Sequence, residues 1–474
     1  MKRTKFLRPL QPLQPLRVLR GATAVAATLL AGCSFIPTYQ RPEAPVAAAF
    51  PQPGASTGTA AADLPWTDFL PDARLRALVD LALHNNRDLR VAVLNVEQTR
   101  ALLGVQRADQ LPSLGAGFNA SRAPGTNGKQ ASTYTLGLSV SAFELDLFGR
   151  VKSLSEAALA RYLASDEGRR AAQVSLIATV ASADLALRAD DELLAVTQRT
   201  LASREEGVKL VRVKFDGGVS AEPELRATEA LVAAARASLI ALQRQRLQDM
   251  NGLVLLLGQP LPATLPVVPA LAGTSFADLP AGLPSEVLLQ RPDVRQAEQL
   301  LVASNANIGA ARAAFFPRIS LTGSAGFAST QLSGLFDNTA WTFTGQLLQP
   351  LFDAGRNENN LAASRTARDI AVAQYEKTVQ TAFREVADAL AGRATLDDQL
   401  AAQQAQADAE ARRLELAELL YRGGVANQLD RLDAERNALA ARQAVVQLQL
   451  ARLQNAVQLY RVLGGGAPAP VQAR

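Results

Sequence analysis

The chain repeats itself, and this duplication restricts its fold more than any other feature of the sequence. Short motifs recur 205 or 206 residues apart along the 474 residues. The matched pairs are Asp88-Leu89-Arg90 with Asp293-Val294-Arg295, Leu111-Pro112-Ser113-Leu114 with Phe316-Pro317-Arg318-Ile319, and Phe215-Asp216-Gly217-Gly218-Val219 with Tyr421-Arg422-Gly423-Gly424-Val425. Self-similarity at a fixed spacing indicates copies of one structural unit. We therefore expect repeat 1 at residues 66–257 and repeat 2 at residues 285–463, joined by a linker segment at residues 258–284.

Each repeat contains an unusually long helical pattern. In repeat 2, apolar residues recur at spacings of three and four from Val372 to Leu390 and again from Val446 to Tyr460, which is typical of helices that pack as coiled coils. At ~1.5 Å per residue, a helix of this length would be roughly 100 Å long. We predict a shorter helix at 72–110 and 285–315, long helices at 151–214 and 357–421, and returning helices at 221–257 and 427–463. The Gly217-Gly218 and Gly423-Gly424 pairs suit the left-handed conformation that ends a helix.

Each repeat also contains a predicted β-hairpin, at residues 111–147 and 316–352. Apolar and polar residues alternate along 134–142 and again from Trp341 to Leu347. Strands of outer-membrane barrels alternate in this way. A sheet with one buried face in a soluble protein gives the same pattern, so alternation alone leaves both interpretations open.

The number of strands predicts an assembly. Four strands cannot close a barrel, since single-chain barrels begin at eight. Two chains would give eight strands, whose interior side chains fill, whereas three chains would give twelve strands and room for an aqueous pore. We therefore expect a mostly α fold with a β-barrel part, in which a homotrimer forms a 12-strand β-barrel joined to a barrel of twelve helices.

The first 32 residues have the features of a signal peptide. A basic, acid-free start is followed by the apolar stretch Gly21 to Gly32, which is too short to span a bilayer. The sequence Leu30-Ala31-Gly32-Cys33 matches a bacterial lipobox, which predicts that Cys33 is lipidated, with palmitate among its acyl groups, and becomes the first mature residue. An ordinary secretory signal with a chance cysteine is the alternative. Ser34 in place of Asp favours the outer membrane, and residues 33–65 read as a lipid-anchored extended linker.

Composition excludes several classes of protein. The net charge of +5 depends on six basic residues in the leader, and the remaining chain has 43 basic and 44 acidic residues, so nothing indicates a nucleic acid partner. One His, one Cys and two Met give no support to a metal site or a disulfide framework. His84 fits a helix end better than a catalytic role, and Gly464-Gly465-Gly466 fits a flexible tail at 464–474 better than a phosphate loop. We expect no enzyme and no cofactor besides the lipid on Cys33.

Several motifs together resemble one family. The chain resembles the TolC-type outer-membrane efflux channels, and within them the lipidated multidrug-efflux subgroup (OprM-like, NodT-type). The matching stretches are Leu30-Ala31-Gly32-Cys33, Pro37-Thr38-Tyr39-Gln40-Arg41-Pro42, Gln290-Arg291-Pro292-Asp293-Val294-Arg295, Ile308-Gly309-Ala310-Ala311-Arg312-Ala313, Tyr421-Arg422-Gly423-Gly424-Val425, Leu432-Asp433-Ala434-Glu435-Arg436 and Leu463-Gly464-Gly465-Gly466. The resemblance implies a trimer with a short β-barrel in outer-membrane lipid and a long periplasmic α-helical barrel. It also implies that the linker at residues 258–284 belongs to the equatorial segment of this assembly.

The resemblance also implies a periplasmic gate. Tyr421 matches the family's aromatic gate residue, Asp433 and Arg436 match an acid and a base, and Asp430 falls where the founding member has another acid. Three-fold symmetry would turn each into a ring, and acidic rings in a narrow pore select cations. The alternative is solvated helix charges, worth only ~0–1 kcal/mol per pair.

The gate residues are poorly matched in repeat 1. Phe215 replaces Tyr421 and Glu224 replaces Asp430, but alanines stand in place of Asp433 and Arg436. Any gate is therefore asymmetric between the repeats.

The implied partners are a periplasmic adaptor (membrane fusion) protein and an inner-membrane RND pump. We expect the adaptor to dock at the turns of Gly217, Gly218, Gly423 and Gly424. The expected function is a passive, gated duct that exports drugs or other small molecules. Two alternatives stay open: a duct for protein secretion driven by an ABC exporter, and a structural envelope lipoprotein without a pore.

Overall fold

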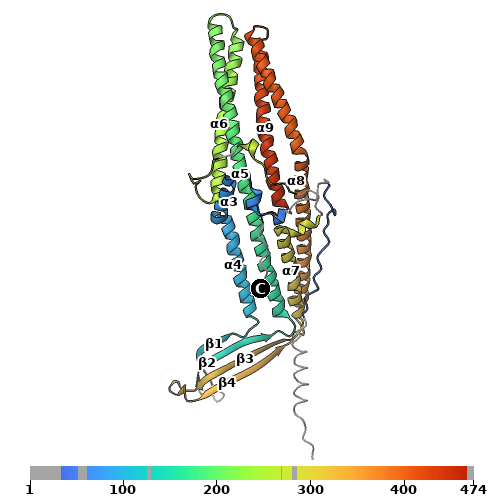
Figure 1. Cartoon of the computed structure of the whole chain (residues 1–474). Helices are drawn as coiled ribbons and strands as arrows, with labels where there is room; N and C mark the ends of the chain where they lie inside the picture. Colours follow the sequence, from blue (N-terminus) through green and yellow to red (C-terminus); the bar gives the residue numbers. More distant parts are fainter. Residues whose placement is uncertain (1–33, 52–60, 125–129, 268–269, 280–284, 467–474) are drawn as a thin grey trace, which may run out of the picture. The chain divides into compact units, whose positions relative to one another are not determined.

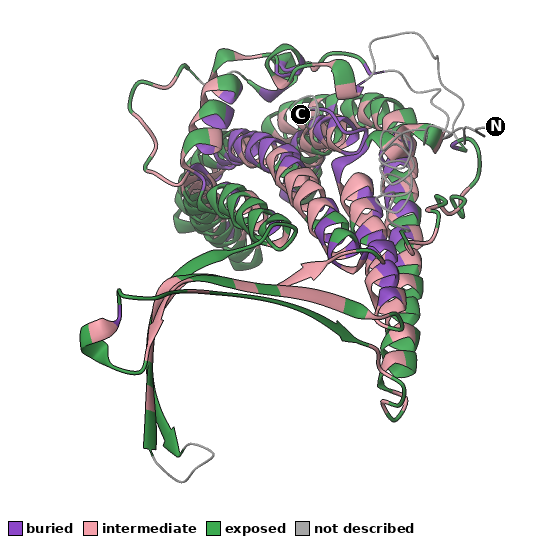
Figure 2. Cartoon of the chain, turned by 90° about the horizontal axis from the view of Figure 1, so that it is seen from below, coloured by how far each residue is buried: buried purple, intermediate pink, exposed green. Residues whose placement is uncertain are grey.

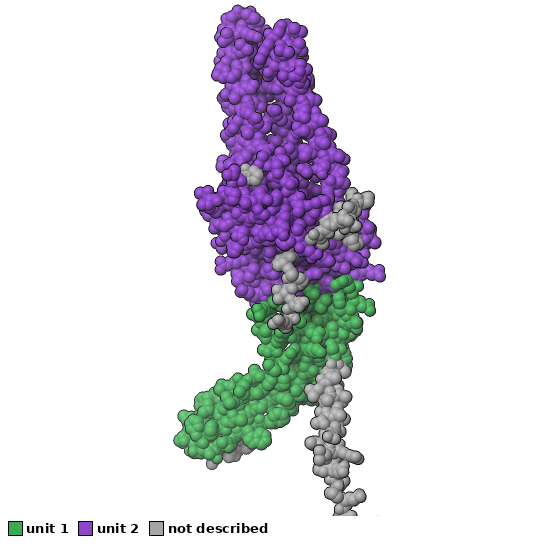
Figure 3. All heavy atoms as spheres, in the orientation of Figure 1, with its two compact units in different colours: residues 1–41, 98–162, 299–372 green, residues 42–97, 163–298, 373–474 purple. Residues whose placement is uncertain are grey.

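The computed structural model describes residues 34–51, 61–124, 130–267, 270–279 and 285–466. These residues form two compact units, coloured separately in Figure 3. Unit 1 takes in the described residues within 1–41, 98–162 and 299–372, and unit 2 those within 42–97, 163–298 and 373–474. The lipobox with Cys33 lies outside the described residues.

The two repeats have the same order of elements (Figure 1). Repeat 1 contains α3 (Ala73–Asn85), α4 (Arg87–Ala108), β1 (Leu114–Pro124), β2 (Gln130–Leu145), α5 (Arg150–Asp216) and α6 (Glu222–Leu257). Repeat 2 contains η3 (Ser285–Gln290), α7 (Pro292–Ala313), β3 (Arg318–Ser329), β4 (Thr339–Leu348), α8 (Arg356–Arg422) and α9 (Gln428–Val462). Four short helices lie outside this pattern: η1 (Ala61–Asp63), α2 (Trp66–Phe69), η2 (Leu271–Gly273) and η4 (Leu332–Gly334). The predicted fold class, mostly α with a small antiparallel β part, is confirmed.

The first helix of each repeat is interrupted, which the sequence analysis did not anticipate. Instead of one helix over 72–110, the structure has α3 and α4 separated by Asn86, which adopts an extended backbone conformation. The Asn86 side chain accepts a hydrogen bond from the Leu89 backbone N–H (2.9 Å) and donates one to the Leu256 carbonyl (2.9 Å). It therefore caps the start of α4 and ties the break to the end of α6. In repeat 2 the corresponding break precedes Pro292, a favoured residue at a helix start.

Helices α5 and α8 each contain 67 residues. Small residues allow close packing along them in unit 2: Ala407 of α8 is buried in a cluster with Ala441 and Val445 of α9. Gly392 of α8 faces Asn455 of α9 so closely that a Cβ would lie 2.4 Å from its Oδ1. The Asn455 amide donates to the carbonyl of Ala389 (3.0 Å), so the glycine permits an interhelical hydrogen bond.

The four strands form one antiparallel sheet in the order β1-β2-β3-β4. Residues directly opposite one another in an antiparallel pair share a face. Leu136 lies opposite both Phe118 and Phe327, and Ala325 lies opposite both Leu138 and Trp341. One face is therefore apolar across all four strands.

The other face of the sheet is polar and small. Ser139 lies opposite Gly115 and Ser324, and the hydroxyls of Ser324 and Thr342 are hydrogen-bonded at 2.8 Å. No residue of the four strands is buried, as the green and pink colours in Figure 2 show. On the apolar face, Trp341 is 78% exposed. Neither face is therefore covered by a second layer of the described chain.

The sheet is strongly curved (Figure 2). Gly137 and Gly326 lie opposite one another on its polar face. A Cβ on Gly137 would come 2.5 Å from the Ala325 carbonyl oxygen, and one on Gly326 would come 2.1 Å from that of Leu136. The two backbones thus approach more closely than side chains allow. A bulge next to Val140, where Ala142 has φ +47°, adds to the local distortion.

No helix among the described residues is long and apolar enough to cross a membrane.

The start of the described chain is fixed on α7 in unit 1. The Asn305 amide donates to the Pro37 carbonyl at 2.7 Å, and the ring of Phe35 stacks on Phe316 with centroids 4.6 Å apart. The segment that follows Cys33 directly is therefore held by side-chain contacts, while residues 34–51 contain no helix.

The end of the described chain also differs from the expected flexible tail. Residues 464–466 form a buried turn in unit 2, with positive φ at Gly464 and Gly466. The turn lies against Tyr460, whose hydroxyl donates to the Leu64 carbonyl at 2.6 Å. The remainder of the expected tail, 467–474, lies outside the described residues.

The close approach of Gly137 and Gly326 leads to a prediction. We expect Gly326→Ala to destabilise the sheet by about 1–3 kcal/mol, because its methyl group would overlap a neighbouring backbone. The measurement is the thermal stability of the purified protein and its yield in the outer membrane. Gly117→Ala is the matched control, since a Cβ there meets nothing within 4 Å. Equal behaviour of the two variants would contradict the steric explanation.

Candidate functional site

The two Gly-Gly turns at the ends of α5 and α8 have the same backbone structure. Gly218 and Gly424 have φ of +75° and +72°. The Val219 N–H donates to the Lys214 carbonyl (2.8 Å), and the Val425 N–H donates to the Leu420 carbonyl (3.0 Å). These are the bonds of a Schellman motif, in which a left-handed residue satisfies the last helical carbonyls.

The turns expose more apolar surface than solvated helix ends normally do. Val219 is 81% exposed and Val425 is 79% exposed. Large apolar side chains of the adjoining helix ends are exposed as well, namely Leu210, Val213, Phe215, Leu416, Leu419, Leu420 and Leu429. Exposed apolar patches of this kind mark interaction surfaces.

Tyr421 connects the two repeats near these turns. Its hydroxyl accepts a hydrogen bond from the Lys214 ammonium (3.2 Å) and donates one to Glu224 Oε1 (3.3 Å). The Lys214 ammonium also lies 4.8 Å from the centre of the Tyr421 ring, and the Arg431 guanidinium carbon lies 5.6 Å from it. Both cations are within the range of a cation–π interaction. Tyr421 of α8 thus joins α5, α6 and α9.

The other three predicted gate residues lie on α9. Asp433 and Arg436 form an ion pair one helical turn apart, and both side chains are more than a third exposed. Asp430 is exposed in the first turn of α9, where its N–H donates to the capping Asn427 side chain (2.9 Å). Within the described part of the chain, no hydrogen bond or ion pair joins these three residues to Tyr421. The single chain therefore contains two separate charged groups near the turns.

A buried ion pair was missed by sequence reasoning. Arg204 of α5 donates to Glu435 of α9 at 2.6 Å, and the two side chains are only 5% and 9% exposed. Arg204 also donates to the Leu231 carbonyl of α6 at 3.1 Å, and Arg431 lies 3.4 Å from Glu435. This group ties α9 to both helices of repeat 1. Glu435 belongs to a motif that carried the family resemblance, but no sequence signal marks Arg204.

A cavity of about 420 Å³ lies in unit 2 next to the Tyr421 group. It is bounded by α5, α8 and α9, and its lining includes Gly207, Tyr421, Gln428 and Arg431. The Gln428 Nε2 atom is buried and has no partner among the described residues. The buried position of this atom keeps it out of reach of a group in the cavity unless the side chain moves.

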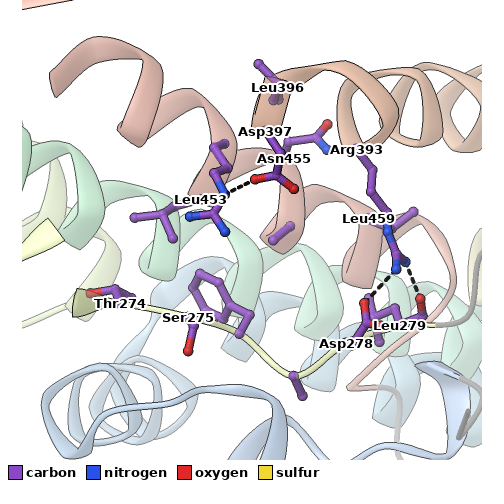
Figure 4. A pocket seen from close by; sticks show the side chains of 14 residues that line it. Thr274, Ser275, Asp278, Leu279, Arg393, Leu396, Asp397, Leu453, Asn455 and Leu459 are labelled. Carbon is purple, nitrogen blue, oxygen red and sulfur yellow. Dashed lines mark hydrogen bonds and ion pairs between the residues drawn. The ribbon is translucent and has the colours of Figure 1, made fainter. Parts of the chain in front are cut away.

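A second, smaller cavity lies between the linker segment, α8 and α9 (Figure 4). Arg393 donates to Asp278 at 2.6 Å and holds the linker beside α8, while Arg452 pairs with Asp397 at 2.5 Å. The four charged side chains of this cavity thus pair with one another. Within the described ranges, no cluster of His, Cys, Asp and Glu could hold a metal ion.

Comparison with protein families identifies the chain. A model described as "OEP: Outer membrane efflux protein" matches residues 78–259 and 283–465. The chain belongs to the outer membrane efflux protein family. The two matches begin 205 residues apart and end 206 residues apart, which is the spacing of the internal repeat. The chain is thus an outer-membrane channel protein and not an enzyme.

Similar proteins cover almost the whole chain. The antibiotic efflux pump outer membrane protein ArpC of Pseudomonas putida is 45% identical over 94% of both chains. The toluene efflux pump outer membrane protein TtgC, also of Pseudomonas putida, has the same identity and coverage. Outer membrane protein OprJ of Pseudomonas aeruginosa is 44% identical, covering 94% of this chain and 96% of its own.

Solved structures agree with this assignment. The open state of the Neisseria gonorrhoeae MtrE outer membrane channel is 42% identical with a TM-score of 0.86, covering 93% of this chain and all of that one. The Campylobacter jejuni CmeC outer membrane channel is 27% identical with a TM-score of 0.84, covering 92% of this chain and 95% of that one.

The buried Arg204–Glu435 pair gives a stability prediction. Arg204→Ala should destabilise the protein by about 3 kcal/mol, because Glu435 would remain buried with only Arg431 beside it. Arg204→Met combined with Glu435→Leu should recover part of this loss, since the uncompensated Glu435 charge is removed while Arg431 keeps only its hydrogen bond to Gln428. The measurement is thermal unfolding followed by circular dichroism.

The control is Arg236→Ala, which breaks the exposed pair between Arg236 of α6 and Glu205 of α5 and should cost only ~0–1 kcal/mol. A loss of stability in the double variant as large as in Arg204→Ala would contradict the explanation by an uncompensated charge.

Proposed function

We propose that this chain forms the gated outer-membrane duct of a tripartite RND-type efflux system, working as a homotrimer with its gate at the Gly-Gly turns. The duct is passive, and its cargo is small molecules, since relatives are named for antibiotic and toluene efflux. The observation that carries the proposal is the two-faced sheet, apolar on one side and polar on the other, with neither side covered.

The edges of this sheet support the trimer. The strand order leaves β1 and β4 as its outer strands. Within the chain, β2 of repeat 1 pairs with β3 of repeat 2. If the last strand of repeat 2, β4, pairs in the same way with the first strand of repeat 1, β1, in a neighbouring copy, three copies would close a barrel. Its apolar face would contact lipid and its polar face would line the pore.

The charged residues near the turns support a gate. In a trimer, Asp430, Asp433 and Arg436 would each form a ring of three. The Tyr421 bonds to Lys214 and Glu224 hold the end of α8 against repeat 1. Opening would require the α8–α9 hairpin to separate from repeat 1, and these contacts oppose that separation.

Single-channel conductance in planar bilayers tests the gate. The parent trimer should show small, rare openings, and the variant Asp433→Ala, Arg436→Ala should open much more often. The pair within one chain lies along α9 and is the same in both states, so the closed state gains only from contacts that these charges make with neighbouring copies. Three exposed pairs between copies would contribute about 1–3 kcal/mol to the closed state, so the open probability should rise roughly five- to hundredfold.

The matched control is Arg412→Ala, Glu415→Ala, which removes an exposed pair of the same spacing on α8. Equal opening of the parent and the gate variant would place the gate elsewhere. No conductance from a folded parent trimer would refute the duct and favour a structural envelope lipoprotein.

The exposed turns support docking of a periplasmic adaptor. Val219 and Val425 flank the glycines and lose contact with water only if a partner covers them. The adjacent cavity is lined by Arg422, whose side chain is 79% exposed and can donate to a partner carbonyl or carboxylate. We place the adaptor at these turns, beside Gly217, Gly218, Gly423 and Gly424.

Photocrosslinking in cells tests the docking site. A photoreactive residue at Val219 or Val425 should give an adduct with a periplasmic protein of the efflux system. The control position is Leu255 of α6, which is equally exposed at 79% and also apolar, and should give none. Adducts at Leu255 but at neither valine would exclude docking at the turns.

A further inference from the structure

Helices α5 and α6 meet at a pair of carboxyl groups that neither the proposed gate nor the docking surface uses. Asp190 of α5 is only 7% exposed, and its Oδ2 atom is buried without a partner among the described residues. Asp249 of α6 lies in hydrogen-bonding contact with the Asp190 side chain. Two carboxyl groups can bond to one another only if one of them carries a proton, because an ionised carboxylate has no donor.

The neighbouring arginines are engaged elsewhere. Arg246 of α6 pairs with Asp191 at 2.5 Å. Arg188, two residues before Asp190 on α5, pairs with Asp184 at 2.6 Å and with Asp72 at 3.0 Å. Within the described ranges, Asp190 therefore forms no ion pair, although Asp249 and Asp191 both place negative charge beside it.

The other elements beside this part of α5 add no charge to the pair. The linker contacts α5 here through the backbone N–H of Leu271. On α9, Gln443 and Gln454 bond to α5 on either side of Asp190. Arg452 is the one charged residue of α9 between them, and it pairs with Asp397 at 2.5 Å. The charged groups that act on Asp190 in the described chain are thus Asp249, Asp191 and Arg246.

The equivalent place in repeat 2 contains no acid pair. At the 206-residue spacing of the Gly-Gly turns, Asp190 and Asp249 correspond to Leu396 and Asn455. The neighbouring ion pair is retained, since Asp191–Arg246 corresponds to Asp397–Arg452 and both pairs measure 2.5 Å. The two repeats therefore share an interhelical ion pair, but only repeat 1 has two carboxyl groups next to it.

The environment of Asp190 favours the protonated form. Burial, followed by the hydrogen bond with Asp249 and the negative charges of Asp249 and Asp191, raises the pKa of Asp190 to about 7, while Arg246 opposes the shift. Because the two carboxyl groups interact, they titrate as a pair. Asp249 is half-buried and so connects the pair to water, and Gln245 donates to it at 3.0 Å.

We propose that Asp190 and Asp249 share one proton and form a pH-sensitive latch between α5 and α6. With the proton bound, a hydrogen bond between the two carboxyl groups joins the helices. Without it, two negative charges face one another at a largely buried site and repel. The latch concerns the packing of repeat 1 and does not rest on the proposed duct.

The direction of the pH effect follows from the raised pKa. An aspartate in an unfolded chain has a pKa of about 3.9. Between this value and about 7, the folded protein binds more protons than the unfolded chain. Stability should therefore fall as the pH rises through this window, and the full cost should be present above it.

Thermal unfolding of the full-length purified protein between pH 5 and 8 tests the latch. Asp190→Asn supplies a permanent N–H donor without a charge, so the Tm of the parent should fall by about 2–3 °C relative to this variant as the pH rises. Amide hydrogen exchange gives a local readout. Protection factors of α5 and α6 amides near the pair should fall roughly tenfold between pH 6 and 7 in the parent but not in Asp190→Asn.

The repeat provides a matched control. Asp397→Asn breaks the exposed ion pair of repeat 2 and should retain the pH dependence of the parent. Asp249→Asn changes the half-buried member of the pair and should remove most of the pH dependence, which keeps the test decisive if Asp190→Asn fails to fold.

A parent-like pH dependence in folded Asp190→Asn, or in Asp249→Asn if only that variant folds, would overturn the latch. So would a parent whose Tm does not fall relative to these variants between pH 5 and 8. Neither measurement reads conductance, so failure of the latch leaves the channel assignment intact.

Discussion

A curved sheet with one apolar and one polar face, covered on neither side, is the constraint on which the rest of this structure depends. In water, the apolar face alone would expose Trp341, Phe343, Phe118 and their neighbours. A second layer of the same chain could bury them, as in many soluble antiparallel sheets, but the described residues form no such layer. Lipid on one side and water on the other satisfies both faces, and it requires that the edges β1 and β4 be closed by other copies. The two-faced pattern, together with the exposure of both faces in the described chain, favours this assembly and the membrane location.

The helices pack through the apolar positions of the heptad pattern, and near the turns they are also held by polar contacts that the pattern does not reveal. Tyr421 bonds to Lys214 and Glu224, and Arg204 bonds to Glu435, so α9 and the end of α8 are fixed against repeat 1. These contacts connect residues that are not equivalent in the two repeats. The order of elements is therefore shared by the two repeats, whereas the contacts near the turns depend on residues that differ between them.

Much of the fold could be predicted from the sequence, since periodicity and turn residues act locally. The long helices expected at 151–214 and 357–421 differ by at most two residues from α5 and α8, because Gly-Gly turns and helical periodicity define their ends. The break at Asn86 was missed, because it depends on a hydrogen bond to the distant Leu256 carbonyl. The partners of Tyr421 were missed for the same reason, since Lys214 lies about two hundred residues away in the sequence. The gate assignment itself stays a prediction.

The equal length of α5 and α8 has a mechanical consequence. Within unit 2, α5 covers residues 163–216 and α8 covers 373–422, roughly 75–80 Å each at ~1.5 Å per residue, so a tilt of about one degree at one end of this part moves the other end by roughly 1.4 Å. Such a lever turns a change too small to disturb packing at its base into one large enough to break a 2.6–3.3 Å hydrogen bond at its tip. The contacts around Tyr421 and Arg204 thus lie where a small rotation produces the largest displacement, and few bonds suffice to hold or release it.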